Sequence, residues 1–498
     1  MSDLQPTHDL VEPLPAEPLE RVADIATHAE LLTGADLVRL GRALPGVFDL
    51  ELVTADGPVT LRCETLLRVL PGRRVVARAS CSGQIVLAKL FVGPRAAVER
   101  QWEERGHFAF RRAGVATPEV VGGGTLAGGG EALLFEFLDD ARPATEADLP
   151  QTMPILARLH SHGVVQNDLH LGNLLRTARG LFLIDGGGVS GMGDDKPLSL
   201  RASVRNLALF LAQVGIRAES GFVAAWHAYC VARGFKTIDA DGRELLDAVH
   251  RARRKRVHAY MKKVLRDCSE FYAEQGFGYF LVCARTSYKD GIEALIDNID
   301  EQFERGLVIK AGNTVTVARL HVDGEPLVIK RYNIKSWHHA IGRMWRPTRA
   351  QRAWQNAHRL RMLGIATIEP VALIEHRFGA LRRSAYLVMR DAGGVDLRER
   401  FESRHIRAIV GLFTDLFRAG LVHGDAKATN FIDVEGRIHL IDLDSMRAPR
   451  SQRALQRGIS RDIDRFVENW DSATIRAALT RAFAPLKDSL TASARRHR

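Results

Sequence analysis

The same order of apolar and polar stretches occurs in two separate parts of the chain. Residues 74–91 contain two short apolar, β-branched runs around SCSG, a pattern that predicts a hairpin, and residues 315–332 repeat it around VDGEP. A helix-like stretch follows each hairpin, at 96–113 and at 348–363, and then come a further strand pair and mostly helical sequence. We therefore expect a small β-rich lobe followed by a larger helical lobe, twice.

Two later segments repeat in the same order. VVQNDLHLGNLL at 164–175 aligns with LVHGDAKATNFI at 421–432, and LFLIDGGG at 181–188 aligns with IHLIDLDS at 438–445. Each copy contains an aspartate, an asparagine five residues later and a second aspartate twelve residues after that. A DxxxxN pattern alone occurs often by chance, but its recurrence with fixed spacing indicates a duplicated functional unit.

The repeated residues suit phosphoryl transfer, which depends on positioning and on neutralising charge. The polar positions are Asp168, Asn173 and Asp185 in the first repeat and Asp425, Asn430 and Asp442 in the second, and the hairpins end near Lys89 and Lys330. The first aspartate would orient the attacking hydroxyl, the asparagine and second aspartate would bind magnesium, and the lysine would hold ATP phosphates. A lone lysine of this kind usually marks a solvated strand end, so the prediction depends on the whole set.

Length and composition agree with a chain of two large domains. The 498 residues exceed one ordinary core, and a net charge of +11 favours an acidic partner. Five scattered cysteines without a CxxC pair argue against disulfides or a zinc site. No signal peptide and no apolar run of about 20 residues is recognisable, so we expect a cytoplasmic protein.

We expect an α+β fold of two tandem protein-kinase-like bilobal domains, each with a small β-rich N-lobe and a larger helical C-lobe. Residues 1–49 would form a flexible tail (1–20) and a short helical preface (21–49). The first kinase-like domain would span 50–300 and the second 305–498.

The motifs resemble the protein-kinase-like superfamily, and more closely its bacterial small-molecule and sugar kinases. NDLHLGN is similar to the catalytic loop of aminoglycoside-phosphotransferase-like enzymes. HGDAKATNF followed by LIDLDS resembles the lipopolysaccharide core sugar kinases, which phosphorylate heptose or Kdo. The whole arrangement, with LVIKRYNIK and RAWQNAHRLRMLGIAT, is similar to tandem members of that family over about residues 50–450.

This resemblance implies an ATP- and Mg²⁺-dependent kinase with a role for each matching residue. The catalytic bases would be Asp168 and Asp425, with His170 and Lys427 at the position that acts on the γ-phosphate; Lys89, Glu103 and Lys330 would serve the nucleotide, and Asn173, Asp185, Asn430 and Asp442 the magnesium.

Three departures from the family pattern stand out. Gln166 replaces the histidine two residues before the base, which the second repeat keeps as His423. Ala353 stands where Glu103 would have its counterpart, so Lys330 lacks an obvious helix partner. Neither second aspartate is followed by phenylalanine, which argues against protein-kinase-style switching.

The glycine-rich segment 122–130 follows the Lys89 helix, so we expect a hairpin there and no phosphate loop.

Positive charge is clustered at 250–256 and again at Lys335, Arg343, Arg346, Arg349 and Arg352. A solvated helix face explains any single arginine, but such clusters also attract anionic lipid. We expect the lipopolysaccharide core oligosaccharide as acceptor and an anionic inner-membrane surface as a second, peripheral partner. No nucleic acid is expected, because aromatic residues are not interleaved with the arginines.

Two alternatives remain open from the sequence. The acceptor would be an antibiotic, another small alcohol or a protein if the chain is a kinase of another class. One repeat would be a pseudokinase that supports the other if the missing acid at Ala353 disables the second.

Overall fold

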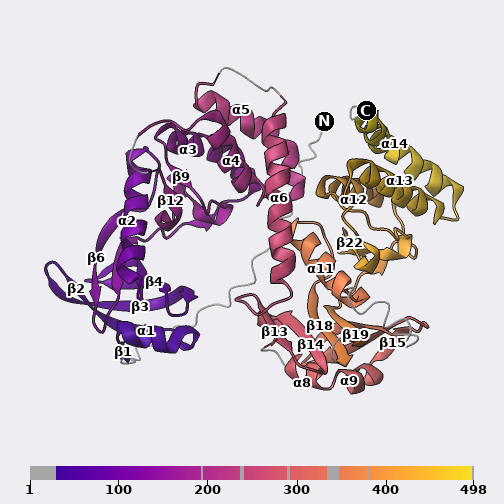
Figure 1. The fold of residues 1–498 in the computed structure, drawn as a ribbon, viewed down its shortest axis with the longest axis horizontal. Coiled ribbons are helices and arrows are strands. Elements are labelled where there is room, and N and C mark those ends of the chain that lie inside the picture. Colours follow the sequence, from indigo (N-terminus) through magenta and orange to yellow (C-terminus); the bar gives the residue numbers. More distant parts are fainter. Residues whose placement is uncertain are drawn as a thin grey trace, which may run out of the picture. The chain divides into compact units, whose positions relative to one another are not determined.

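The computed structural model divides into two compact units, each built around a seven-stranded sheet (Figure 1). The described residues are 30–191, 195–235, 241–288, 292–333, 347–378 and 381–495. The first unit comprises residues up to 109 together with 116–141 and 184–188, and the second comprises 110–115, 142–183 and 189–498. These limits do not coincide with the predicted domains, which stay a prediction.

The sheet of the first unit has the strand order β1-β2-β3-β4-β5-β7-β6, and a pairing of β6 with β2 closes it on itself. Its strands are β1 (Glu30–Leu32), β2 (Phe48–Thr54), β3 (Gly57–Leu70), β4 (Arg74–Cys81), β5 (Gln84–Phe91), β6 (Val120–Leu126) and β7 (Glu131–Glu136), and its helical segments are α1 (Gly34–Leu40), η1 (Gly41–Ala43), α2 (Ala96–Arg112) and η4 (Gly186–Gly188). The sheet therefore begins inside the predicted helical preface, because β1 and β2 both pair within it.

Alternation along β5 decides where its lysine points. Val86, Ala88 and Leu90 belong to the cluster that fills the closed sheet, whereas Phe91 packs on the opposite face with Ala96 of α2. Because side chains alternate between faces in a strand, Lys89 lies on the face that α2 covers.

The predicted glycine-rich hairpin is confirmed as β6 and β7. In it Gly124 passes so close to β2 that a Cβ atom would lie 2.2 Å from the carbonyl oxygen of Val53. Glycine is therefore needed there for backbone packing.

The second unit begins with the helical part of the first repeat. Its elements are β8 (Arg142–Pro143), η2 (Glu146–Asp148), α3 (Leu149–Ser161), β9 (Val165–Gln166), η3 (Leu171–Asn173), β10 (Leu174–Thr177), β11 (Gly180–Leu183), β12 (Val189–Ser190), α4 (Leu200–Leu211), η5 (Ile216–Gly221), α5 (Phe222–Ala232) and α6 (Arg243–Lys263). No helix within the described ranges is both long and apolar enough to cross a bilayer.

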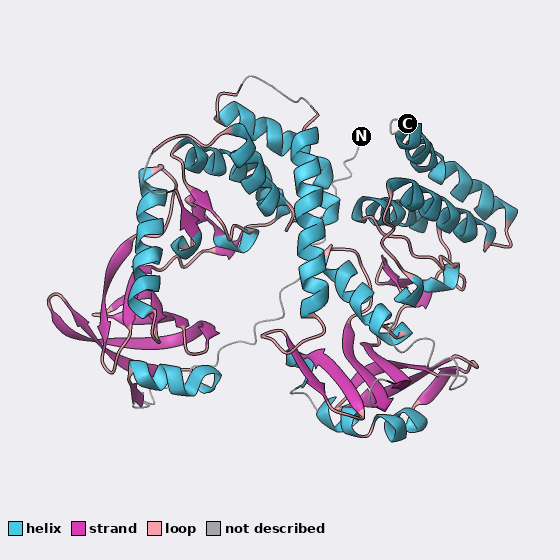
Figure 2. Cartoon of the chain, viewed as in Figure 1, coloured by secondary structure: helices cyan, strands magenta, loops and turns pink. Residues whose placement is uncertain are grey.

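The strands of the second unit's open sheet are drawn in magenta in Figure 2. Their order is β13-β14-β18-β19-β17-β16-β15. Its strands are β13 (Phe271–Gln275), β14 (Tyr279–Ala284), β15 (Leu307–Lys310), β16 (Val315–Val322), β17 (Glu325–Tyr332), β18 (Pro370–Phe378) and β19 (Leu381–Arg390), with helices α7 (Arg285–Ser287), α8 (Glu293–Asp297), α9 (Ile299–Arg305) and α11 (Arg349–Met362). The sheet starts at Phe271, well before the predicted domain limit at 305.

Both faces of this sheet are covered. Leu327 and Ile329 of β17 pack in the cluster that contains α8 and α9, whereas Tyr332 packs with Ala353 and Trp354 of α11 on the other face. Lys330 alternates onto the α11 face, as Lys89 does onto the α2 face.

The chain ends with a helical part around the second repeated motif. It contains β20 (Val395–Asp396), α12 (Ser403–Ala419), η7 (Ala428–Asn430), β21 (Phe431–Val434), β22 (Arg437–Leu440), η8 (Leu443–Ser445), α13 (Gln452–Glu468) and α14 (Ala473–Arg495). Phe413, Phe466 and Phe483 from the three helices meet in its core, with ring centroids 5.1–6.4 Å apart.

The strand order β4-β5-β7-β6 in the first sheet recurs as β16-β17-β19-β18 in the second. Both lysine hairpins turn through two residues of positive φ, Ser82-Gly83 and Asp323-Gly324, which suits a tight hairpin turn. The predicted hairpins and the helices after them are thus confirmed, and the chain has a mixed α and β fold.

Candidate functional site

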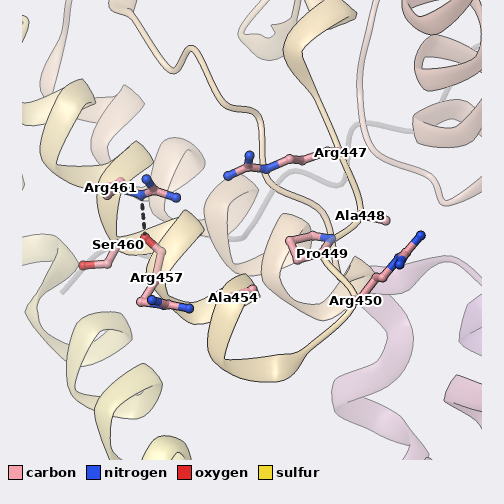
Figure 3. Close-up of a pocket in the computed structure, with 8 residues that line it drawn as sticks. All are labelled: Arg447, Ala448, Pro449, Arg450, Ala454, Arg457, Ser460 and Arg461. Carbon is pink, nitrogen blue, oxygen red and sulfur yellow. Dashed lines mark hydrogen bonds between the residues drawn. The ribbon is translucent and has the colours of Figure 1, made fainter. Parts of the chain in front are cut away.

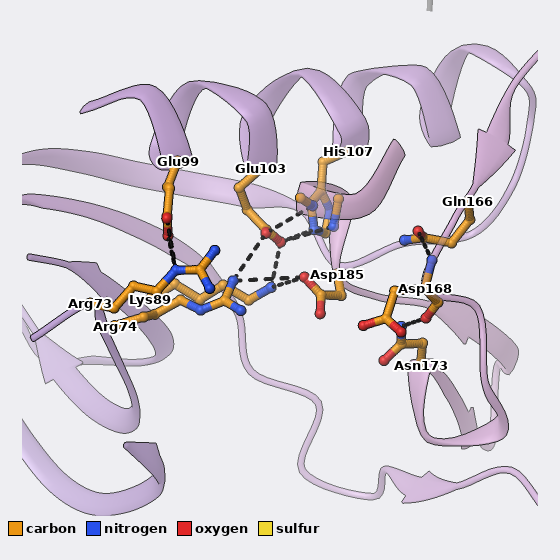
Figure 4. Close-up of polar contacts among 12 residues, drawn as sticks. Arg73, Arg74, Lys89, Glu99, Glu103, His107, Gln166, Asp168, Asn173 and Asp185 are labelled. Atoms are coloured by element: carbon orange, nitrogen blue, oxygen red, sulfur yellow. Dashed lines mark hydrogen bonds and ion pairs between the residues drawn. The ribbon is translucent and has the colours of Figure 1, made fainter. Parts of the chain in front are cut away.

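In the first unit, Lys89 forms a buried ion pair with Glu103 of α2 (Figure 4). Glu103 is fully buried, and its two oxygens also accept hydrogen bonds from the backbone N–H groups of Gly186 at 3.0 Å and Gly187 at 3.1 Å. Asp185, directly before these glycines, lies 3.7 Å from Lys89 Nζ through its Oδ1. The predicted lysine, helix acid and metal aspartate therefore come together.

Neighbouring positive charge and burial have opposite effects on the pKa of Glu103. Burial alone would raise the pKa of Glu103, but Lys89 and His107 outweigh burial and hold its pKa well below the usual range. Burial lowers the pKa of His107, whose Nε2 lies 3.2 Å from Glu103 Oε1 and whose Nδ1 lies 2.9 Å from Thr117 Oγ1. A neutral imidazole that donates to Glu103 and accepts from Thr117 fits both contacts.

The loop predicted to be catalytic in the first repeat lies in the second unit. Asn173 Nδ2 donates to the carbonyl oxygen of Asp168 at 2.8 Å, which fixes the loop between them. The backbone N–H of Asp168 donates to Gln166 Oε1 at 3.1 Å, and Asn206 of α4 donates to the Gln166 carbonyl at 3.0 Å. Gln166 thus supplies the acceptor for the backbone of the predicted base.

Behind this loop, His160 is buried and held by Asn206 at 3.0 Å and by the Tyr229 hydroxyl at 2.8 Å. Burial lowers the pKa of His160 to about 4, so the imidazole is neutral near pH 7. It positions Asn206, which in turn donates to the Gln166 carbonyl of the loop.

In the second repeat, Lys330 Nζ lies 2.5 Å from Asp442 Oδ1 and 3.9 Å from Asp444 Oδ2. Arg349 of α11 holds Asp444 through Nη2 at 2.7 Å. Asp444 therefore lies where the missing counterpart of Glu103 would act. Asp444 was not predicted from the sequence, although the IDLD motif, with a second aspartate after the first, was a signal for it.

Asp442 and Asp185 share an unusual backbone conformation. Their φ angles are +56° and +69°, in the left-handed region that few residues other than glycine adopt. Burial would raise the pKa of Asp442, but Lys330 overrides burial and lowers it. Both aspartates therefore leave an apolar strand through the same turn. Asp442 lies beside its lysine at 2.5 Å, and Asp185 lies 3.7 Å from its own.

The second catalytic loop is tied together through Asp425. Asn430 Nδ2 donates to the Asp425 carbonyl at 2.8 Å, the distance found between Asn173 and Asp168. Lys427 Nζ lies 3.2 Å from Asp425 Oδ2, and Arg465 of α13 lies 3.1 Å from Oδ1. Asp425 therefore presents a carboxylate between two cations.

His423 joins this loop to the strand before Asp442. Its Nε2 lies 3.1 Å from the Ile441 carbonyl, and the Asp425 backbone N–H lies 3.4 Å from its Nδ1. Burial lowers the pKa of His423, so a neutral ring donates to one backbone group and accepts from the other. Asp462 of α13 accepts from the Gly424 N–H at 3.1 Å through either oxygen.

The residues predicted to bind magnesium carry suitable donor atoms. Magnesium at a nucleotide is usually held by one or two protein carboxylates together with phosphates and water, so three clustered acids are not needed. Among the described residues, no group of three or more His, Cys, Asp or Glu could hold a metal ion by itself. In the second repeat Asp442 offers a carboxylate, and Asn430 uses its Nδ2 in the loop, which leaves Oδ1 for a cation.

Other predicted positions gain less support. His170 begins η3 and is half-buried, with no hydrogen bond or ion pair to Asp168, although both residues are described. In the 250–256 cluster, Arg253 is buried and pairs with Glu219 at 2.5 Å, so it stabilises the fold. Lys335, Arg343 and Arg346 lie outside the described residues.

The second repeat can now be compared with known proteins. Residues 304–482 match the model of the lipopolysaccharide kinase (Kdo/WaaP) family. For this part of the chain the match confirms the family resemblance that the motifs indicated, and with it the expectation of an ATP-dependent kinase. The matched range contains Lys330, Asp425, Asn430 and Asp442, whereas the first repeat lies outside it.

Two solved structures are similar in part. One, described as WaaP in complex with acyl carrier protein, is 19% identical, with coverage of 44% of this chain and 97% of that chain and a TM-score of 0.31. The other, vaccinia related kinase 3, is 13% identical, with coverage of 32% and 56% and a TM-score of 0.25. No curated protein matches the chain.

Proposed function

We propose that the chain is a lipopolysaccharide core kinase with two kinase-like bilobal domains, in which each repeat transfers the γ-phosphate of ATP to a heptose or Kdo hydroxyl. The observation that carries the proposal is the recurrence of one arrangement in both repeats. Each lysine faces a helix-covered sheet surface near an aspartate of positive φ, and each asparagine holds the carbonyl of a loop aspartate at 2.8 Å.

In the second repeat, each predicted site residue has a role in phosphoryl transfer. Asp425 accepts a hydrogen bond from the acceptor hydroxyl and orients it, while Lys427 beside it faces the transferred phosphoryl group. Lys330 holds the α- and β-phosphates. Asn430 and Asp442 would hold Mg²⁺, which neutralises phosphate charge when bound.

In the first repeat, Asp168, Asn173 and Asp185 take the same tasks, with Lys89 held by Glu103. His170 replaces the lysine near the γ-phosphate. Gln166 accepts from the Asp168 N–H as His423 accepts from Asp425, so the exchange keeps the loop geometry. The pseudokinase alternative was based on the missing helix acid at Ala353. Asp444 lies 3.9 Å from Lys330 in its place, which supports an active second repeat.

The acceptor hydroxyl would belong to core oligosaccharide on its lipid anchor at the cytoplasmic face of the inner membrane. A basic chain with a net charge of +11 suits that anionic surface. The protein would therefore act there as a peripheral enzyme.

Replacement of each predicted base tests the proposal. Purified Asp168→Asn, Asp425→Asn and double variants are incubated with ATP, Mg²⁺ and unphosphorylated core oligosaccharide, and the products are read by mass spectrometry. Each single variant should fail to add one phosphate, and the double variant should add none. Asp471→Asn is the matched control, because Asp471 is 91% exposed and pairs only with Arg398 among the described residues. Unchanged core phosphate in both single variants would refute the assignment.

A further inference from the structure

Helix α13 carries an arginine at every fourth position along one face. These residues are Arg453, Arg457, Arg461 and Arg465. Residues four apart lie above one another on a helix, about 6 Å apart along its axis. The face that Leu455, Ile459 and Phe466 share is buried instead, so the packing of the helix does not require the arginines.

The arginines form a continuous row that ends at the predicted catalytic base. Arg457 Nε lies 3.4 Å from the Arg453 carbonyl and Arg461 Nε lies 3.3 Å from the Arg457 carbonyl. At the far end, Arg465 contacts Asp425 Oδ1 at 3.1 Å. An anionic group bound along this row would therefore lie at a defined distance from the hydroxyl that Asp425 orients.

A second segment completes a pocket over the row. The chain after Asp442 returns past α13, and an open pocket of about 690 Å³ forms between them (Figure 3). Its lining residues are Arg447, Ala448, Pro449, Arg450, Ala454, Arg457, Ser460 and Arg461. Four guanidinium groups and one hydroxyl thus supply the polar side-chain atoms, and none of the described residues that line the pocket is acidic.

The positive charge of this pocket is not compensated locally. Within the described part of the chain, no carboxylate forms an ion pair with Arg447, Arg450, Arg457 or Arg461, although Arg447 does stabilise the charge on Asp462 from a distance. Like charges four residues apart destabilise a helix, and solvated helix faces usually mix both signs. A bound anion would remove this repulsion.

We propose that this arginine pocket binds anionic groups, phosphates or carboxylates, carried by the acceptor on sugars next to the one that receives the phosphate. The inference rests on the proposed function and adds a specificity determinant to it. Guanidinium groups pair with phosphate and carboxylate through two parallel hydrogen bonds. Arg461 and Arg457 lie about 6 and 12 Å along α13 from Arg465, a reach that covers neighbouring sugars of an oligosaccharide.

The test measures acceptor recognition at the second site alone. In an Asp168→Asn background, Arg457→Gln and Arg461→Gln are combined, and Arg407→Gln serves as a control that removes one exposed charge from α12. The acceptor is deacylated core oligosaccharide, which is water-soluble and leaves membrane binding out. We expect its KM to rise about tenfold or more while the KM for ATP changes less than twofold. Chemical removal of the acceptor's phosphates should reduce the difference in acceptor KM between the double variant and its parent.

Each other outcome identifies what fails. An unchanged acceptor KM in the double variant, with a parent that phosphorylates the core, would overturn the pocket and leave the proposed function intact. If that variant instead loses binding only to phosphatidylglycerol vesicles, the pocket faces a membrane and the inference is wrong. A parent that adds no phosphate would refute the proposed function; calorimetric binding of the same oligosaccharide, with and without the two arginines, then decides the pocket separately.

Discussion

Replacement of Glu103 by glutamine would test how the first repeat holds its lysine. Glu103 uses only acceptor atoms: Oε1 accepts from Lys89, from the Gly186 N–H and from His107 Nε2, and Oε2 accepts from the Gly187 N–H. Arg74 adds a fifth donor at 3.6 Å from Oε2. A glutamine of the same shape offers one oxygen and one NH₂ group, so its NH₂ must face a donor whichever way the amide turns.

The free-energy cost of this replacement depends on how deeply the ion pair is buried and on which partner Lys89 keeps. Glu103 is fully buried and Lys89 is 7% exposed, and removal of one partner from such a pair costs about 3–5 kcal/mol. Lys89 keeps Asp185 at 3.7 Å, so the lower end of that range applies. We expect about 3 kcal/mol, which corresponds to roughly a hundredfold change in a local opening equilibrium.

Hydrogen exchange measures this locally. The amide protons of Gly186 and Gly187 are bonded to Glu103, so the peptide that contains them should exchange roughly a hundredfold faster in the variant. Glu99→Gln on the same helix is the control, because Glu99 pairs with Arg73, whose side chain is 61% exposed, and such a pair contributes about 1 kcal/mol or less. Equal exchange in the two variants would refute the view that Glu103 anchors this segment.

Further predictions concern the other supports of the two sites. The pKa of His160 is about 4 in the folded protein and 6.5 in the unfolded chain. Between pH 6.5 and pH 4 only the unfolded chain binds a proton there, so the free energy of unfolding should fall by roughly 3 kcal/mol over this range. Urea denaturation of His160→Gln should not show this fall. His423→Gln should keep second-site turnover within about tenfold, because Gln166 fills this role in the first repeat, whereas His423→Leu should lose far more by leaving the Asp425 N–H and Ile441 carbonyl unpaired. Asp444→Asn should raise the KM for ATP about tenfold in an Asp168→Asn background, and an unchanged value would show that Asp444 does not help to position Lys330.

Local patterns were sufficient to predict the parts of the sites that lie within one motif. The hairpins, the following helices and the loops around Asp168 and Asp425 depend on alternation, turn residues and short spacing, all visible in sequence. Glu103 was also predicted, because it lies in the helix-like stretch that follows the Lys89 hairpin. The structure places it beside Lys89. The pairing of Lys330 with Asp442, 112 residues later, was expected only in general terms.

Other features depend on contacts that sequence does not reveal. The hairpin of β13 and β14 joins the second sheet through β18, about 90 residues later, so a domain limit at 305 divides that sheet. The arginine row on α13 was visible as a spacing of four, but its meaning depends on Arg465 reaching Asp425 and on the segment 447–450 closing over it. Long-range pairing of this kind has no local signature.

The two repeats hold the same lysine in different ways, and this difference bears on how each nucleotide site is assembled. In the first repeat, the acid comes from α2 and also binds the backbone after Asp185, so the buried Glu103 holds the helix, the lysine and the segment after Asp185 together. In the second repeat, the acid is Asp444, which comes from the segment directly after Asp442, and α11 contributes Arg349 in place of an acid. Asn356 of α11 completes the link by donating to the carbonyl of Leu443 at 2.8 Å. The charges have thus exchanged sides between helix and strand end, while the contact between helix, lysine and metal aspartate is kept. We therefore expect the second site to work without an acid at position 353, because the duplicated motif already brings Asp444 to within 3.9 Å of Lys330.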